Sequence, residues 1–398
     1  MRTSMYLEYT PEHRELSREL RAYFARLLTP EVREALGGTN EDRPAYREII
    51  RQIGKDGLLG LGWPKEFGGQ GRPAVDQYIL FDEINRAQAP FPFVTINNIG
   101  PMLMRYGTEE QKRTYLPGML TGDVIFAIGY SEPGSGTDLA SLGAKAEATP
   151  EGGWVINGQK VFTSGVSQAD FVWMAVRTDP DAPKHKGITI LIVPTSDPGF
   201  SCTPIATSGI THTNASYYED VRVGPEALVG EVNGGWRLIT GQLGHERVGL
   251  AAMGGRTEQL WTDVAAWAAE PDADGIRVLD KPWVRTELAR DYAELTAMRL
   301  LNWKIAVVKE GQNPAPAAAS VAKVYGTETH DRVCRNLVSV VGPRATRRPG
   351  APDAVLGGQL EAYTRGSYIN TFGGGTNEVL RDMIAVAGLG MPRKGRSA

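Results

Sequence analysis

The residue in this sequence best placed for proton transfer is Glu246. On a helix it would share a face with Ile239, Leu243 and Leu250, which stand seven and three residues before it and four after it. Burial on an apolar face disfavours the charged form of a carboxylate and raises its pKa, which suits the residue to act as a general base. The alternative, from the residues alone, is a glutamate at the edge of the stripe that pairs with a neighbouring cation.

A polar loop follows an apolar run at Tyr130–Asp138, which reads YSEPGSGTD. Its backbone N–H groups and hydroxyls could face a polar ligand, or the segment could be no more than a polar turn. The glycine spacing is not that of a dinucleotide-binding Rossmann turn, and a strand is predicted where that motif needs a helix. No GxxxxGK[ST] phosphate-binding loop occurs in the chain.

Two further segments combine turn-forming residues with groups that could meet a ligand. Asn157–Lys160 predicts a hairpin turn, after which Phe162 and Ser164 could present an aromatic face and a hydroxyl to a ring system. Three successive glycines in Phe372–Glu378 would let the backbone approach a ligand closely. Thr376 is expected to cap a terminal helix.

The composition excludes several classes of protein. Among 398 residues, 43 Lys and Arg stand against 46 Asp and Glu, and the formal charge of -3 gives no electrostatic basis for nucleic acid or an anionic membrane as the main partner. No apolar run is long enough to span a bilayer, and residues 1–11 hold no secretory apolar core, so we expect a cytoplasmic enzyme. Two isolated cysteines, Cys202 and Cys334, and scattered histidines predict neither a disulfide scaffold nor a metal site.

The elements that would position these residues follow an α, β, α order. Residues 1–122 have helical patterning, with Thr10 and Thr108 as N-caps. Residues 123–232 contain short β-branched and aromatic runs that predict an antiparallel β domain. Helices return over 233–398. We therefore expect an α+β fold of three domains with these bounds. Strands are expected at 124–130, 154–156, 171–176, 188–193, 200–205 and 217–223, and the later helices at about 236 into the 260s, 282–310, 316–341, 354–369 and 376–387.

Together these features resemble the acyl-CoA dehydrogenase family over essentially the whole chain. The resemblance is strongest at Tyr130–Asp138 followed by Asn157–Lys160, in the family's order and spacing, and Gly375–Arg381 is similar to the family's last-helix motif. Gly62–Gly69 also resembles part of the family's N-terminal domain. The resemblance implies the acyl-CoA dehydrogenase fold, with an N-terminal helical domain, a middle β domain and a C-terminal helical bundle.

The resemblance also implies a reaction, the oxidation of an acyl-CoA thioester to the trans-2-enoyl-CoA. A carboxylate removes the α proton, and the flavin of FAD accepts the β hydride at N5. An electron-transfer flavoprotein would then take the electrons from the reduced flavin. The resemblance implies FAD contacts for Tyr130, Ser131, Phe162, Ser164, Thr376 and Glu378, and substrate contacts for Thr137, Arg247 and Gly374.

The sequence departs from the family pattern at the usual position of the base. Most members have a catalytic glutamate directly before the terminal Gly-Thr pair, and here that residue is Gly374. Some members instead carry the base on the long helix of the C-terminal domain, and Glu246 falls at that position. The resemblance therefore implies Glu246 as the base, while the backbone N–H of Gly374 would still polarise the thioester carbonyl.

Two further departures imply a second, different subunit. The arginine of the family's Arg-x-x-Phe-Gly stretch is missing from residues 267–272, and the family's Gln-x-x-Gly-Gly stretch is replaced by Ser339–Pro343. In homo-oligomers of the family those residues reach a neighbour's FAD, so a homologous partner in an α2β2 heterotetramer would have to supply them. The pattern resembles the catalytic subunit of actinobacterial steroid side-chain acyl-CoA dehydrogenases, which implies a steroid side-chain CoA thioester as substrate.

Two other interpretations keep the fold and change the role. A flavin-dependent oxidase or monooxygenase would pass electrons rapidly from the reduced flavin to oxygen. A flavin-free partner subunit would have a structural role only. The presence of Ser131, Ser164 and Glu246 argues against the structural subunit, which would not need them.

Overall fold

The computed structural model describes residues 9–37, 44–209, 212–251, 254–307 and 316–392. The chain begins with helices, as predicted. Thr10 and Thr108 cap the helices that follow them through capping boxes, and Leu16, Leu20 and Phe24 form the buried stripe of the first helix. The elements of this region are α1 (Pro11–Leu27), α2 (Pro30–Leu36), α3 (Pro44–Lys55), α4 (Ala74–Ala87), the π-helix η2 (Val94–Ile99), α5 (Gly100–Tyr106) and α6 (Glu109–Thr121).

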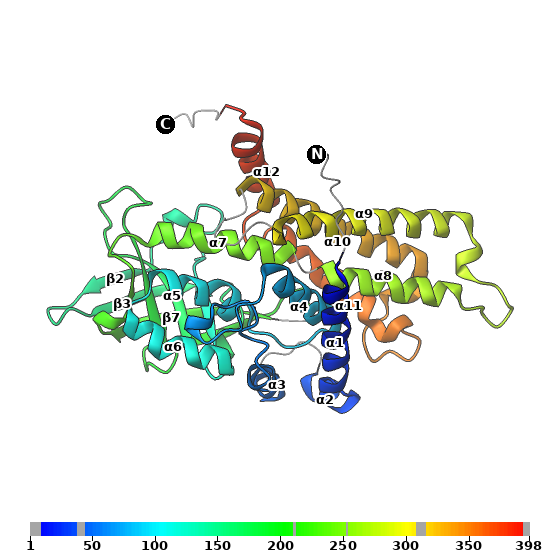
Figure 1. The fold of residues 1–398 in the computed structure, drawn as a ribbon. Coiled ribbons are helices and arrows are strands. Elements are labelled where there is room, and N and C mark those ends of the chain that lie inside the picture. The colour runs from blue at the N-terminus through cyan, green and yellow to red at the C-terminus, as the bar shows by residue number, and fades with distance from the viewer. Residues whose placement is uncertain (1–8, 38–43, 210–211, 252–253, 308–315, 393–398) are drawn as a thin grey trace, which may run out of the picture.

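An eight-stranded sheet follows, at the left of Figure 1. The strands are β1 (Phe126–Gly129), β2 (Lys145–Ala148), β3 (Trp154–Lys160), β4 (Phe171–Arg177), β5 (Ile188–Pro194), β6 (Phe200–Ile205), β7 (Thr213–Val223) and β8 (Leu228–Val229). Their order is β6-β7-β3-β2-β4-β5-β8, and β1 pairs with β4. Most pairs are antiparallel, but β1 and the start of β2 pair with β4 in parallel, so the sheet is mixed rather than wholly antiparallel. The chain between β1 and β4 is long and contains β2 and β3, and a long crossover of this kind is what a parallel pair requires.

The central strands β4 and β5 are buried on both faces. Residues 172–176 of β4 and 188–193 of β5 are almost completely inaccessible to solvent. Uninterrupted apolar runs of this kind are typical of strands covered on both sides. On one side the cover includes η2, which packs against β1, and the first helix after the sheet, which packs against β5.

The predicted hairpin turn at Asn157–Lys160 is wrong. Strand β3 runs straight through these residues, and its register with β7 shifts between Ile156 and Gly158, as at a β-bulge. The Asn157 side chain closes the irregularity, because its amide donates to Asp220 Oδ1 at 2.9 Å and its oxygen accepts from the Asp220 N–H at 2.9 Å. A Cβ on Gly158 would lie 2.6 Å from the Cβ of Ala144, so the glycine is required by a close approach and not by a turn.

Helices return after the sheet. They are α7 (Gly235–Ala251), α8 (Gly254–Ala269), α9 (Pro282–Ala306), α10 (Pro316–Val341), α11 (Gln359–Ser367) and α12 (Asn377–Met383). Figure 1 shows α7 above the sheet, α8 to α10 extending to the right, and α12 projecting at the top. The proposed domain bounds at 122/123 and 232/233 stay a prediction.

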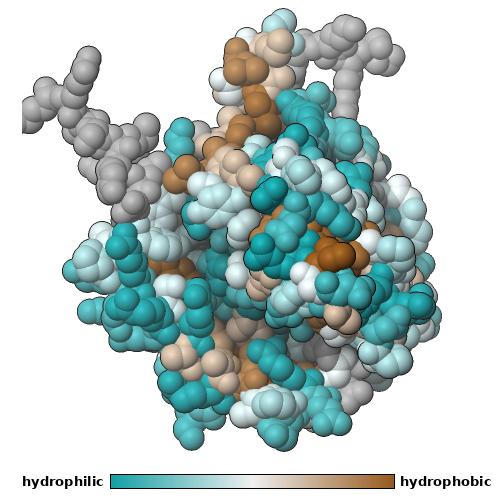
Figure 2. Space-filling view, turned by 90° about the vertical axis from the view of Figure 1, so that its right-hand side faces the viewer, coloured by the Kyte–Doolittle hydropathy of each residue, from teal (hydrophilic) through white to brown (hydrophobic). Residues whose placement is uncertain are grey.

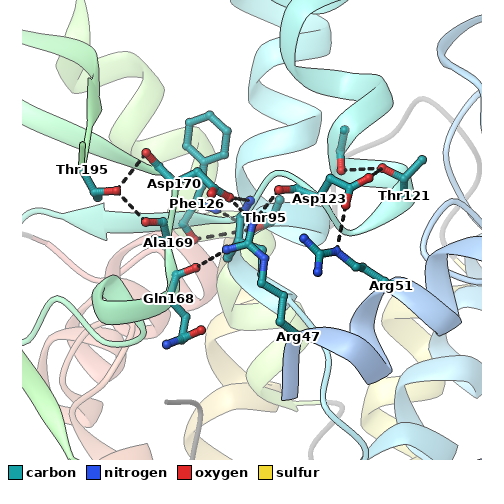
Figure 3. Close-up of polar contacts among 12 residues, drawn as sticks. Arg47, Arg51, Thr95, Thr121, Asp123, Phe126, Gln168, Ala169, Asp170 and Thr195 are labelled. Carbon is teal, nitrogen blue, oxygen red and sulfur yellow. Dashed lines mark hydrogen bonds and ion pairs between the residues drawn. The ribbon is translucent and has the colours of Figure 1, made fainter. Parts of the chain in front are cut away.

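Arg47 of α3 fastens the N-terminal helices to the sheet (Figure 3). Its guanidinium donates to the carbonyl oxygens of Gln168 at 3.0 Å and Asp123 at 2.5 Å, and to Asp170 Oδ2 at 2.6 Å. Asp170 Oδ2 also accepts from the N–H of Ile125 at 2.8 Å. One arginine thus joins α3 to the two segments that lead into the parallel strands β1 and β4.

Candidate functional site

The loop after β1 is held from behind by a buried lysine. Lys160, which is 0% exposed, donates to the Tyr130 carbonyl at 3.1 Å and to Glu132 Oε1 at 2.7 Å. The Glu132 carboxylate also accepts from the N–H groups of Gly143 at 2.6 Å and Ala144 at 2.9 Å. Burial lowers the pKa of Lys160 to about 8, against the opposing effect of Glu132. The ammonium–carboxylate pair is therefore present at neutral pH.

Directly after Lys160 the chain turns sharply and presents Phe162 to solvent. Phe162 has a φ of 59° and its side chain is 65% exposed. A positive φ costs a non-glycine residue on the order of 1–3 kcal/mol and persists only where neighbours enforce it. Thr163 does so here, because its N–H donates to the Asn214 carbonyl at 2.9 Å and its buried hydroxyl lies 3.0 Å from Ser216 Oγ. The exposed Ser164 hydroxyl follows, 2.9 Å from Thr213 Oγ1.

The loop after β1 and the Phe162–Ser164 turn lie side by side. The N–H of Val161 donates to the Ser131 carbonyl at 2.8 Å, so the strand-end residues Tyr130 and Ser131 stand next to Phe162 and Ser164. The structure therefore brings together four of the residues that the sequence predicted around one ring system. Thr137 lies in the exposed part of the same polar loop.

The side chain of Tyr130 connects this region to α7. Its buried hydroxyl accepts from Trp173 Nε1 at 3.1 Å and donates to Gln242 Oε1. Gln242 is 0% exposed, and its Nε2 has no hydrogen-bond partner among the described protein atoms. Gln242 is not among the residues predicted for the site from the sequence. Its position four residues before Glu246, on the same helical face, was the available signal.

Glu246 and Arg247 belong to α7, but their side chains lie outside the described residues. Two earlier residues of α7 that would share a helical face with Glu246 lie in the described part. Ile239 is 0% exposed, and Leu243 is half-buried. The role of Glu246 stays a prediction.

A second group of predicted residues lies between α11 and α12. Gly374 and Gly375 have φ values of 66° and 104°, and no hydrogen bond among the described residues uses the N–H of Gly374. Thr376 caps α12 as predicted, since its hydroxyl oxygen accepts from the N–H of Val379 at 3.3 Å. Glu378 is exposed. No hydrogen bond of the described residues joins this group to the Tyr130–Phe162 region, although α10 packs against both α7 and α12.

The residues around Tyr130 and Phe162 suit a flavin. The exposed Phe162 ring offers an apolar face, and Ser131 and Ser164 offer hydroxyls. Two buried amides also lack an acceptor among the described protein atoms, Gln242 Nε2 beside Tyr130 and Asn214 Nδ2 beside Thr163. Buried donors without a partner are costly, and the carbonyl oxygens of an isoalloxazine are acceptors of the matching kind.

Neither a metal centre nor a membrane-spanning helix is found in the described part of the chain. It contains no group of three or more His, Cys, Asp or Glu side chains arranged to hold a metal ion. In the same part, none of the helices combines the length and apolar character needed to cross a membrane.

Family models match nearly the whole chain. The acyl-CoA dehydrogenase N-terminal domain matches residues 10–123, the middle domain residues 127–221, and the C-terminal domain residues 233–389. The chain is 50% identical to acyl-CoA dehydrogenase FadE26 of Mycobacterium tuberculosis, over 98% of this chain and 100% of that protein.

Two solved structures are similar throughout. The Tcur3481-Tcur3483 steroid ACAD matches with 55% identity and a TM-score of 0.93, over 98% of this chain and 100% of that chain. The ChsE4-ChsE5 complex from Mycobacterium tuberculosis matches with 50% identity and a TM-score of 0.91, over the same shares, 98% and 100%. These likenesses confirm the α+β architecture expected from the sequence.

Proposed function

The chain belongs to the acyl-CoA dehydrogenase family, and we propose that it catalyses the FAD-dependent dehydrogenation of an acyl-CoA thioester to the trans-2-enoyl-CoA. The family and the named relatives make it an oxidoreductase acting on CH–CH groups. The observation that carries the proposal is the hydrogen bond from Val161 to the Ser131 carbonyl, because it aligns the strand-end loop with the outward-facing Phe162–Ser164 turn.

In the proposed reaction the chain's own residues bind, orient and move a proton. FAD, when bound, supplies the acceptor for the hydride that leaves the β carbon. Phe162 would pack against its ring, and Tyr130, Ser131, Ser164, Thr376 and Glu378 would complete the binding site. Glu246 removes the α proton, and the N–H of Gly374 donates to the thioester oxygen, where negative charge develops in the transition state. Thr137 and Arg247 hold the CoA portion.

The proposed substrate is a steroid side-chain CoA thioester. It rests on the likeness to the solved steroid ACAD, at 55% identity over 98% of this chain. An assay that compares steroid side-chain CoA thioesters with straight-chain acyl-CoA thioesters tests it through kcat/KM. Higher kcat/KM for the straight-chain compounds would contradict the steroid assignment and leave the dehydrogenation intact.

A second homologous subunit is part of the proposal, in an α2β2 assembly that passes its electrons to an electron-transfer flavoprotein. Both relevant solved structures are complexes of two named components. The two stretches that lack the family's FAD-reaching residues lie at the surface, where Pro271 and Ser339 are exposed. Exposed apolar side chains also gather on and beside α12, and Figure 2 shows brown on this projecting segment. They are Tyr368, Ile369, Phe372, Val379, Leu389 and Met391.

The experiment is to produce the chain alone and together with a homologous partner, and to weigh each product by native mass spectrometry. We expect bound FAD only in the co-produced complex. Anaerobic addition of acyl-CoA should bleach the visible absorbance of the oxidised flavin and yield a product with two hydrogen atoms fewer. A fully flavinylated, active homotetramer of the chain alone would refute the partner. Rapid reoxidation by air would favour the oxidase, and absence of flavin even with the partner would favour the structural subunit.

A further inference from the structure

A buried lysine on α10 holds the glycine loop between α11 and α12 through hydrogen bonds. Lys323 is 0% exposed, and its Nζ donates to the carbonyl oxygens of Thr371 at 3.2 Å and Gly375 at 2.9 Å, and to Asn377 Oδ1 at 2.8 Å. An ammonium is a strong hydrogen-bond donor with three N–H groups, which suits it to bind several carbonyl and amide oxygens at once. Charge-assisted hydrogen bonds of this kind are the stronger ones in proteins.

The third acceptor, Asn377, also connects the loop to other residues of α10. Asn377, the first residue of α12, donates from Nδ2 to Thr327 Oγ1 at 3.1 Å and to Glu328 Oε1 at 3.1 Å. Glu328 in turn accepts from Arg381 of α12 at 2.7 Å. The lysine therefore sits at the inner end of a network that fixes the start of α12 on α10, and the loop before α12 is fixed with it.

The loop needs these hydrogen bonds because its own glycine-rich sequence supplies no rigidity. Gly374 and Gly375 both adopt positive φ, a region in which glycine has several accessible conformations. The Gly375 carbonyl points at Lys323, and in a trans peptide the N–H of the next residue, Thr376, points the opposite way. The N–H of Gly374 makes no hydrogen bond with any described residue and is only half-buried. The loop thus keeps carbonyl oxygens on the lysine side while an amide N–H stays available.

We propose that Lys323 is a positioning residue for the dehydrogenation, which holds Gly374 so that its N–H meets the thioester oxygen. This inference rests on the proposed function, in which Gly374 supplies that donor. Lys323 is buried behind the loop and acts through its hydrogen bonds to it. Its positive charge, set behind the loop in a buried environment, also favours the negative charge that develops on the thioester oxygen as the α proton leaves.

The test compares Lys323→Met with the wild-type complex. Methionine keeps an unbranched side chain that is one atom shorter, and it removes every donor. Hydrogen exchange of peptides spanning residues 371–378 should become faster, by about tenfold. The anaerobic rate constant for flavin reduction by a saturating acyl-CoA should fall by about 10–100-fold, because misplacing an oxyanion-hole donor loses part of the roughly 10²–10³-fold that such a donor contributes. The KM should change little, because the lost interaction belongs to the transition state.

Thr257→Val is the matched control. It removes the hydroxyl that contacts the buried His330 elsewhere in the helical bundle, so it perturbs stability without touching the glycine loop. It should leave both the exchange of 371–378 and the reduction rate as in the wild type. If Lys323→Met does not accumulate as folded protein, Lys323→Gln, which keeps two N–H donors, should give intermediate changes in both measurements.

The outcomes separate this inference from the proposed function. Unchanged exchange and an unchanged reduction rate in a folded Lys323 variant overturn the positioning role. Faster exchange with an unchanged reduction rate also overturns the positioning role, since the hydrogen bonds of Lys323 would then be structural only. If no acyl-CoA reduces the wild-type flavin, the proposed function fails, and the positioning role with it, while the exchange data still decide whether Lys323 holds the loop.

Discussion

Tyr130 donates a hydrogen bond from its phenol to the side-chain oxygen of Gln242, and both residues are buried. The contact ties the end of β1 to α7 one helical turn before Glu246. Residues at this spacing share a helical face, so the orientation of the proposed base depends on how α7 is held against the sheet. The indole of Trp173 completes the connection by donating to the same phenol oxygen at 3.1 Å.

Tyr130→Phe should therefore destabilise the protein and slow its chemistry. The change leaves Gln242 Oε1 and Trp173 Nε1 buried without a partner, and each such group costs roughly 1–3 kcal/mol. Chemical denaturation measures the loss, and anaerobic flavin reduction measures the effect on the site. Tyr217→Phe is the control, because its hydroxyl makes only an exposed contact with Thr203 at 3.4 Å. Equal stability of the two variants would show that the buried contact contributes nothing.

Glu246→Gln should nearly stop flavin reduction in the assembled complex. The amide keeps the size of the side chain but cannot accept the α proton, and loss of a positioned general base costs on the order of 10²–10⁴ in rate. FAD content and native mass should be unchanged. Gly374→Glu in the same background should partly restore reduction, because it places a carboxylate at the family's commoner position. A wild-type reduction rate in Glu246→Gln would show that the base lies elsewhere.

Arg247→Ala should weaken thioester binding more than it weakens FAD binding. The guanidinium is assigned to the CoA portion of the substrate, whose phosphates it would pair with. Titration of the flavin-loaded complex with acyl-CoA gives the first affinity, and release of FAD on dilution gives the second. Loss of FAD with unchanged thioester affinity would place Arg247 on the cofactor.

Glu132→Gln should lower stability at neutral pH and lose that effect in acid. Burial raises the pKa of Glu132, but Lys160 and the N–H groups of Gly143 and Ala144 together lower it more, so the folded-state pKa lies below its ordinary value of 4.5. The carboxylate therefore stabilises the fold above pH 4.5, and this contribution disappears as the pH falls through the folded-state pKa. Leaving Lys160 unpaired in the interior should cost about 3–5 kcal/mol at pH 7.

The stability difference between wild type and Glu132→Gln is measured by denaturing both proteins at a series of pH values from neutral to acidic. The exposed pair of Arg277 and Asp280 provides the control, and Asp280→Asn should leave stability unchanged within error. A difference between wild type and Glu132→Gln that stays constant into acid would contradict the charge-based account.

Arg47→Ala should weaken the attachment of α3 to the sheet. Its guanidinium makes three hydrogen bonds there and is only 20% exposed, and a hydrogen bond to a charged group contributes about 1.5–3 kcal/mol. Arg51→Ala is the matched control on the same helix, because Arg51 and Asp123 are half-exposed and pairs of that kind contribute roughly 0–1 kcal/mol. Denaturation midpoints that fall equally in both variants would refute this ranking.

Local sequence signals were enough for much of the architecture. The Thr10 and Thr108 caps, the Leu16–Leu20–Phe24 stripe and the apolar runs of β4 and β5 each depend on neighbours a few residues away, and the structure confirms them. Signals that depend on pairing failed. Lys145–Ala148 has no β-branched residue and is a strand only because β3 and β4 pair with it. Asn157-Gly158 has the composition of a turn, yet β7 holds it in a strand.

The sequence by itself determined which residue types are available to the site, and the tertiary structure alone decided which of them meet. Ser131 and Ser164 could be singled out from motifs, because each lies within a recognisable local pattern. The hydrogen-bond partners of Lys160, Gln242 and Lys323 could not be predicted, because a polar residue on a strand or helix reveals nothing of what it will contact. Each of these three residues is completely buried, and folding brings it to a hydrogen-bond partner 28 to 112 residues away in the chain. Burial makes those contacts strong and costly to lose, and burial is a property of the packed molecule.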